Sequence, residues 1–171
     1  MTTNPVQART RLASTGIDPR SPRFGAGITA VLLLVVIALS LAAPMAGTLA
    51  ERATAPGFIL FVVISALFAW GAAAGVKRHP YGAVFRALAR PRLSPPRELE
   101  DPAAPTFAQG VGFVITLVGI ILHLAGVPFA IVVAASAAFI AAFLNSVFAY
   151  CLGCQLYVLI LRARNARGAA A

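Results

Sequence analysis

The sequence predicts an all-α membrane protein with four transmembrane helices in a compact bundle and a short interfacial amphipathic helix in its cytoplasmic loop. Three observations lead to this prediction. The 171 residues are 60% hydrophobic and 11% charged, with a mean hydropathy of +0.87, whereas soluble domains are about half apolar and a quarter charged. Four apolar runs are long enough to cross a bilayer, which takes about 20 helical residues. The basic residues flank these runs.

The apolar runs divide the chain into three parts. Residues 1–17 are polar and are expected to form a disordered tail. Residues 18–161 form the membrane domain, with spans at about 24–49, 58–76, 107–124 and 129–161. Residues 162–171 form a basic C-terminal tail. Pro44 is expected to kink or end the first span near its far side.

The distribution of Lys and Arg predicts the orientation. These residues precede the first span, fill the loop between the second and third, and follow the fourth; of the 14, only Arg52 lies elsewhere. Because four spans bring the three basic segments to one side, both termini are predicted to be cytoplasmic, in a multi-pass protein of the bacterial inner (plasma) membrane. The loop cations expected at the cytoplasmic interface are Lys77, Arg78, Arg86, Arg90, Arg92 and Arg97.

The net charge of +9 is thus explained by the lipid bilayer as a partner, and binding to nucleic acid is not expected. Small residues, such as Gly112 and Gly119 in the third run, would let helices approach closely. That contact would serve one bundle or a homo-oligomer equally well.

The long loop contains a helical pattern in "HPYGAVFRALARP", residues 79–91. Its apolar residues Tyr81, Val84, Phe85 and Leu88 recur at the spacing of one helix face, which predicts a short amphipathic helix over about 80–90. Such a helix would lie on the membrane interface or pack as a lid under the bundle, and both readings stay open. The proline-rich segment after it favours an extended strap.

The fourth apolar run is too long for a simple span. Its 33 residues would measure about 50 Å as one helix, against a hydrocarbon core of about 30 Å. The run must therefore tilt, break, or project from the membrane. Asn145 within it is expected to face the bundle, and His123, near the outer end of the third span, is expected to face the bundle or the interface.

The same run holds the only two cysteines, Cys151 and Cys154, in "YCLGCQLY". Residues three apart share a face of a helix. Three hypotheses follow: a redox-active dithiol, half of a metal site, or two small packing residues. No metal site is predicted, since His79 is the one plausible further ligand and makes only a weak set with the two thiols.

Helix continuity decides between these hypotheses. In one continuous helix the pair would lie late in the helix, which raises the thiol pKa, whereas a break before the pair would lower it. Near the cytoplasmic boundary the pair would rest as free thiols. With no second cysteine pair in the chain, dithiol chemistry requires an external partner.

Three segments resemble a family of small integral-membrane domains of unknown function that is common in actinobacteria. They are "DPRSPRFGAGITA", "HPYGAVFRALARPRLSPPRELEDPAAPTFAQ" and "YCLGCQLY", which together cover about residues 18–161. A C-x-G-C near the end of the last span is typical of that family. The resemblance implies a four-span membrane domain and brings no activity, substrate or cofactor.

The leading functional expectation is a non-catalytic membrane module or accessory subunit. The alternative is a partner-dependent thiol-redox or sulfur-relay component that uses Cys151 and Cys154 and meets a cytoplasmic thioredoxin-like or sulfur-transfer protein. If the protein is an enzyme, its activity is that of a thiol–disulfide oxidoreductase. No cofactor is predicted.

Overall fold

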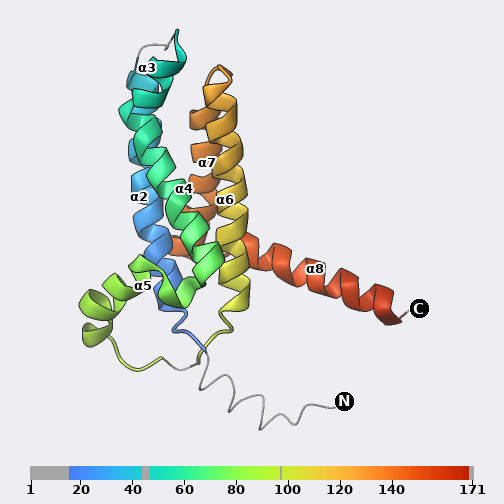
Figure 1. Cartoon of the computed structure of the whole chain (residues 1–171). Helices are drawn as coiled ribbons and strands as arrows, with labels where there is room; N and C mark the ends of the chain where they lie inside the picture. The colour runs from blue at the N-terminus through green and yellow to red at the C-terminus, as the bar shows by residue number, and fades with distance from the viewer. Residues whose placement is uncertain (1–15, 44–46, 97, 170–171) are drawn as a thin grey trace.

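The computed structural model describes residues 16–43, 47–96 and 98–169. This part of the chain contains seven α-helices and no strand, and four of the helices are long and apolar enough to cross a membrane (Figure 1). The predicted all-α membrane fold is confirmed. The four candidate spans are α2 (Arg20–Ala42), α4 (Pro56–Ala74), α6 (Ala103–Leu124) and α7 (Ala130–Phe148). The shorter or outlying helices are α3 (Leu49–Thr54), α5 (Pro80–Val84) and α8 (Leu152–Ala169).

The two ends of the bundle differ in charge. At one end α2 and α6 begin, α4 ends, and α5 lies beside them (Figure 1). We call this the basic end, because the exposed cations of residues 77–92 lie there. The opposite end carries α3 and the turn between α6 and α7. Pro44, Arg97 and most of the predicted N-terminal tail lie outside the described residues.

A capping box and one cation close the opposite end. The Thr48 hydroxyl accepts a hydrogen bond from the Glu51 backbone N–H, and the Glu51 carboxylate accepts one from the Thr48 N–H, which satisfies two donors at the start of α3. Arg52 then donates to the Leu124 carbonyl at 3.1 Å. This bond ties α3 to the end of α6.

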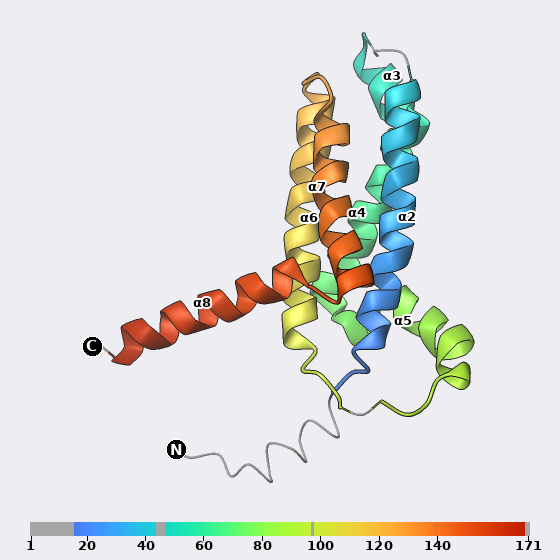
Figure 2. The same ribbon diagram turned by 180° about the vertical axis from the view of Figure 1, so that it is seen from behind.

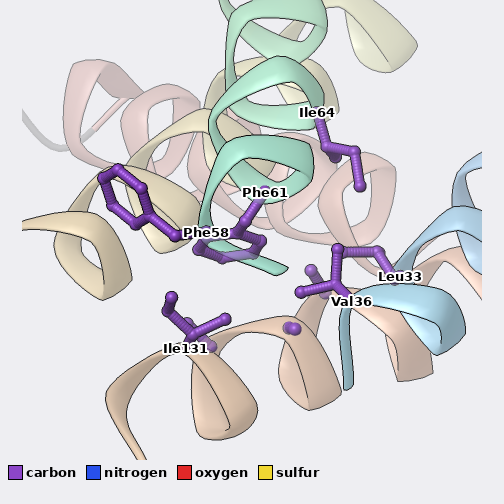
Figure 3. Close-up of a cluster of buried hydrophobic side chains, with 9 residues drawn as sticks. Leu33, Val36, Phe58, Phe61, Ile64 and Ile131 are labelled. Carbon is purple, nitrogen blue, oxygen red and sulfur yellow. The ribbon is translucent and has the colours of Figure 1, made fainter. Parts of the chain in front are cut away.

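The apolar core lies in the half of the bundle away from the basic end. Figure 3 shows its side chains converging from α2, α4 and α7. Its buried members are Leu33, Val36, Phe58, Phe61, Ile64, Ile131, Ala134, Ala135 and Ala138. Within this half, the Thr116 hydroxyl on α6 donates to the Ser65 hydroxyl on α4 at 2.9 Å. Both side chains are buried, so the bond satisfies two polar groups where water is excluded.

Small residues of the third span serve contacts inside this chain. A Cβ on Gly112 would lie 2.6 Å from the Phe68 ring of α4, and one on Gly119 would collide with Ala134 of α7. Each glycine therefore lets α6 approach a neighbouring helix more closely than a larger residue would allow.

The loop helix divides its predicted apolar face between two environments. The chain is helical from Pro80 to Arg92, with a wider turn at Phe85–Ala89 and a tighter one at the end. Phe85 is 2% exposed, and its ring lies 5.7 Å from that of Phe24 on α2. Leu88 is 57% exposed. One side of the helix thus covers the start of α2, and the other stays open.

The fourth apolar run, expected at 129–161, is two helices. α7 ends at Phe148, and α8 begins at Leu152 and leaves the bundle sideways (Figures 1 and 2). The span is therefore 19 residues long, which matches a hydrocarbon core of about 30 Å. The length of this run allowed a tilted, a broken or a projecting helix, and the structure shows a broken one.

Candidate functional site

A left-handed turn separates α7 from α8 and positions the cysteines. Ala149 has φ 57°, which ends α7, and the Tyr150 N–H donates back to the Leu144 carbonyl at 3.1 Å. This is the αL arrangement that closes many helix C-termini, although glycine is its usual residue. The chain turns away from the bundle axis within three residues, so that Cys151 directly precedes the first residue of α8.

The cysteine pair therefore lies at a helix N-terminus. Cys151 and Cys154 are joined by a disulfide, with Cα atoms 5.2 Å apart. The Cys154 backbone N–H donates to Sγ of Cys151 at 3.2 Å, which is the geometry of a side chain capping a helix. Backbone N–H groups at a helix N-terminus favour a negative charge, and in the reduced pair they favour a thiolate.

Gly153, between the cysteines, holds α8 against α6. A Cβ at this position would lie 2.6 Å from Cβ of Ala108 and 2.7 Å from its Cα. The α8 backbone therefore rests directly on α6. The rings of Phe107 and Tyr157, 5.5 Å apart, continue this contact one turn further along. The glycine of the C-x-G-C is needed for this approach.

A cavity of about 600 Å³ opens beside the pair, in the half of the bundle nearer the basic end. Cys151 and Gly153 contribute to its wall. Small and apolar residues of α2, α6 and α7 form much of its part inside the bundle, including Gly25, Ala26, Ala108, Gly112, Ala141 and Ala142.

Polar groups occupy two zones of this cavity. The amides of Gln109 and Asn145 line it, and in the described part of the chain neither side chain has a hydrogen-bond partner. Lys77, Arg86 and Arg90 line it toward the basic end, together with Asp18, His79 and Tyr81. Asn145 thus faces the bundle interior as expected of a polar residue in a span. Gln109 was not predicted as a site residue, although a lone amide within an apolar run was a signal for it.

A family profile described as "Domain of unknown function (DUF4395)" matches residues 17–162. The chain belongs to the DUF4395 family. The match takes in all four spans, the loop helix and the cysteine pair. No curated protein and no solved structure matches the chain.

His79 of the DUF4395 domain uses both ring nitrogens within the protein. Nδ1 accepts from the Tyr81 N–H at 3.2 Å, so the neutral ring carries its proton on Nε2 and donates to the Leu67 carbonyl at 3.1 Å. Burial lowers the pKa of His79, and the bond to Leu67 opposes this shift. No nitrogen of the ring is left for a metal, and the described residues contain no group of three or more potential metal ligands.

His123 lies at the far end of the DUF4395 domain from the cysteines. Its ring stacks on Phe58 with centroids 5.3 Å apart, and Nε2 lies 3.4 Å from the Arg52 carbonyl. The structure therefore separates the two polar residues considered together for the bundle interior: Asn145 belongs to the cavity, and His123 to the opposite end.

The basic end is closed by the segments that flank α2 and α6. Ile17 and Glu100 exchange two backbone hydrogen bonds of 2.9 Å, which joins the lead-in of α2 to the proline-rich strap. Asp18 and Arg20 form a salt bridge of 2.8 Å, and the Arg20 hydrogen bond lowers the Asp18 pKa. Arg20 also donates to the Ser94 carbonyl.

The loop cations are presented to solvent from this closed end. Five of the six predicted interface cations are described, and all five are exposed: Lys77, Arg78, Arg86, Arg90 and Arg92.

Proposed function

We propose that the DUF4395 domain is a membrane-embedded thiol–disulfide exchange component that works with an external partner. The supporting observation is the break at Ala149, which puts Cys151 and Cys154 at the N-terminus of α8 with the Cys154 N–H bonded to the Cys151 sulfur. Helix N-termini are where reactive C-x-x-C pairs have stabilised thiolates. Two structural cysteines in a continuous apolar helix would have neither feature.

The chemistry assigns different roles to the two sulfurs. In the reduced protein the Cys151 thiolate attacks one sulfur of a disulfide in the partner. A mixed disulfide forms, the partner's S–S bond breaks, and the released sulfur takes up a proton. Cys154 then loses its proton and attacks Sγ of Cys151, which re-forms the internal disulfide and releases the second partner sulfur as a thiol. Two electrons and two protons pass to the partner, and the reverse steps reduce the pair.

The proposed partner is a soluble thioredoxin-like or sulfur-transfer protein on the cytoplasmic side. The exposed cations at the basic end support a cytoplasmic location for this end and both termini, in a bacterial plasma membrane. The pair belongs to the same half of the bundle, because Gly153 packs on Ala108, five residues after the start of α6. A reporter fused at Arg97 tests the orientation, and a signal outside the cytoplasm overturns it.

Single serine variants test the exchange chemistry. In Cys154→Ser the mixed disulfide on Cys151 cannot resolve, so we expect it to accumulate as a heavier species on non-reducing gels. Cys151→Ser lacks the attacking sulfur and serves as the matched control, in which we expect no such species. Alkylation rates of the two cysteines in oxidised and reduced membranes complete the test. Equal unreactivity in both conditions refutes the proposal.

A non-catalytic module that anchors a cytoplasmic partner is the second candidate. The five exposed cations of the loop favour it, because they form a positively charged surface beside the membrane. Co-purification of the partner with variant proteins distinguishes the two functions. An anchored partner is lost with Arg86→Gln and Arg90→Gln and retained with both cysteines changed to serine, whereas a trapped exchange partner depends on Cys151.

A further inference from the structure

We propose that the cavity beside Cys151 binds a membrane-soluble quinone, which accepts the two electrons of the reduced cysteine pair. This inference rests on the proposed thiol exchange and adds its electron acceptor. The partner protein would then deliver electrons to the pair, and the pair would pass them into the membrane.

The shape of the cavity requires an apolar occupant. Along α6 its wall runs from Pro105 to Ile115, a rise of about 15 Å at 1.5 Å per residue. The cavity therefore extends from the basic end well into the membrane-spanning part of the bundle. Its volume of about 600 Å³ falls within the 300–1,000 Å³ typical of small-molecule sites. A soluble anion would match only the cationic side chains near the basic end.

The polar groups of the cavity suit carbonyl oxygens. Gln109 on α6, whose amide lies against Gly71 of α4, and Asn145 on α7 both line the cavity, and each has NH₂ donors without a partner in the described residues. An amide donor inside an apolar wall gains most from an acceptor such as a ketone oxygen. A quinone combines an apolar ring with two such oxygens, whereas a hydrocarbon chain offers none.

Cys151 is the member of the cysteine pair that lines this wall. Cys151 lines the cavity together with Leu152 and Gly153. Its sulfur accepts the Cys154 N–H, and so it is the sulfur at which negative charge is favoured in the reduced pair. The reacting group and the hydrogen-bond donors thus face one space.

The reaction balances without a further reagent. Two S–H bonds break in the reduced pair, and one S–S bond forms between Cys151 and Cys154. The two electrons enter the quinone ring, and the two thiol protons end on its two oxygens, which gives one quinol. Renewed reduction by a dithiol partner returns the pair to its starting state.

The test uses the full chain in phosphatidylcholine vesicles. The protein is reduced with dithiothreitol, the dithiothreitol is removed, and the sample is kept free of oxygen. Decylubiquinone is added, and its absorbance and the protein thiols are followed together. We expect one quinol and one disulfide per protein. Gln109→Leu and Asn145→Leu should each slow the reaction about tenfold, the effect of one lost hydrogen bond of ordinary strength. Gln155→Leu is the matched control, because this exposed amide on α8 is outside the cavity wall.

Wild-type vesicles that reduce the quinone but do not exchange thiols with thioredoxin refute the proposed partner, and three other outcomes separate the two proposals. Wild-type vesicles that exchange thiols with reduced thioredoxin but do not reduce the quinone refute the inference and leave the proposed function standing. The same holds if both cavity variants react as fast as Gln155→Leu. Wild-type vesicles that neither exchange with thioredoxin nor reduce the quinone refute the proposed function itself.

Discussion

Replacing Gly153 by alanine tests whether α8 is held on α6 by direct backbone contact. The added Cβ would lie 2.6 Å and 2.7 Å from Cβ and Cα of Ala108. Overpacking of this kind costs about 1–3 kcal/mol, and alanine recovers about 0.5–1 kcal/mol over glycine in a helix. The blocking atoms belong to a backbone and a short side chain, neither of which can rotate away. We therefore expect a net destabilisation of about 1–2 kcal/mol.

The assay combines a global and a local measurement. Thermal unfolding in one detergent, followed by circular dichroism, should show a lower midpoint, by about 2–4 °C for each kcal/mol in a chain of this size. Hydrogen exchange should rise in residues 152–161, because α8 loses its support. Gly110→Ala is the control: the atom nearest its added Cβ is 3.9 Å away on Ala72, so helix propensity should raise its midpoint. If Gly153→Ala melts like Gly110→Ala with unchanged exchange in α8, the contact does not hold the helix.

Three further predictions concern the turn, the loop and the core. Ala149→Gly should stabilise the protein by up to about 1 kcal/mol, because φ 57° is costly for alanine and not for glycine; a lower thermal midpoint contradicts this. The free energy of unfolding should fall as the pH drops below about 6.5, the pKa of free histidine, because burial lowers the His79 pKa and the unfolded chain takes up the proton first. His79→Gln should flatten that part of the pH profile of the melting midpoint, and an unchanged profile contradicts the assignment. Thr116→Val should cost about 1–3 kcal/mol by leaving the buried Ser65 hydroxyl without its 2.9 Å partner, and adding Ser65→Ala should restore part of the loss; a double variant no more stable than the single one contradicts that account.

Sequence alone was sufficient to predict the membrane class, the number of spans and the exposed loop cations at one end of the bundle. These properties follow from hydropathy over about 20 residues and from charge beside each run, and neither depends on distant contacts. The helix at Pro80–Arg92 was also predictable from the sequence, because Tyr81 and Phe85 lie at helical spacing. The same pattern did not predict that Phe85 would be buried against Phe24 while Leu88 remained exposed.

The position of the cysteine pair depends on contacts between distant parts of the chain. No glycine or proline occurs at residues 149–151, so the local sequence carries no signal for the break. The break is held by Gly153 on Ala108, a contact between residues 45 apart in the chain. The same folding brings Gln109 and Asn145 to one cavity and engages both nitrogens of His79, which the sequence had offered as a metal ligand. Hydropathy is a property of each segment, whereas a helix N-terminus facing a cavity exists only once separate segments pack together.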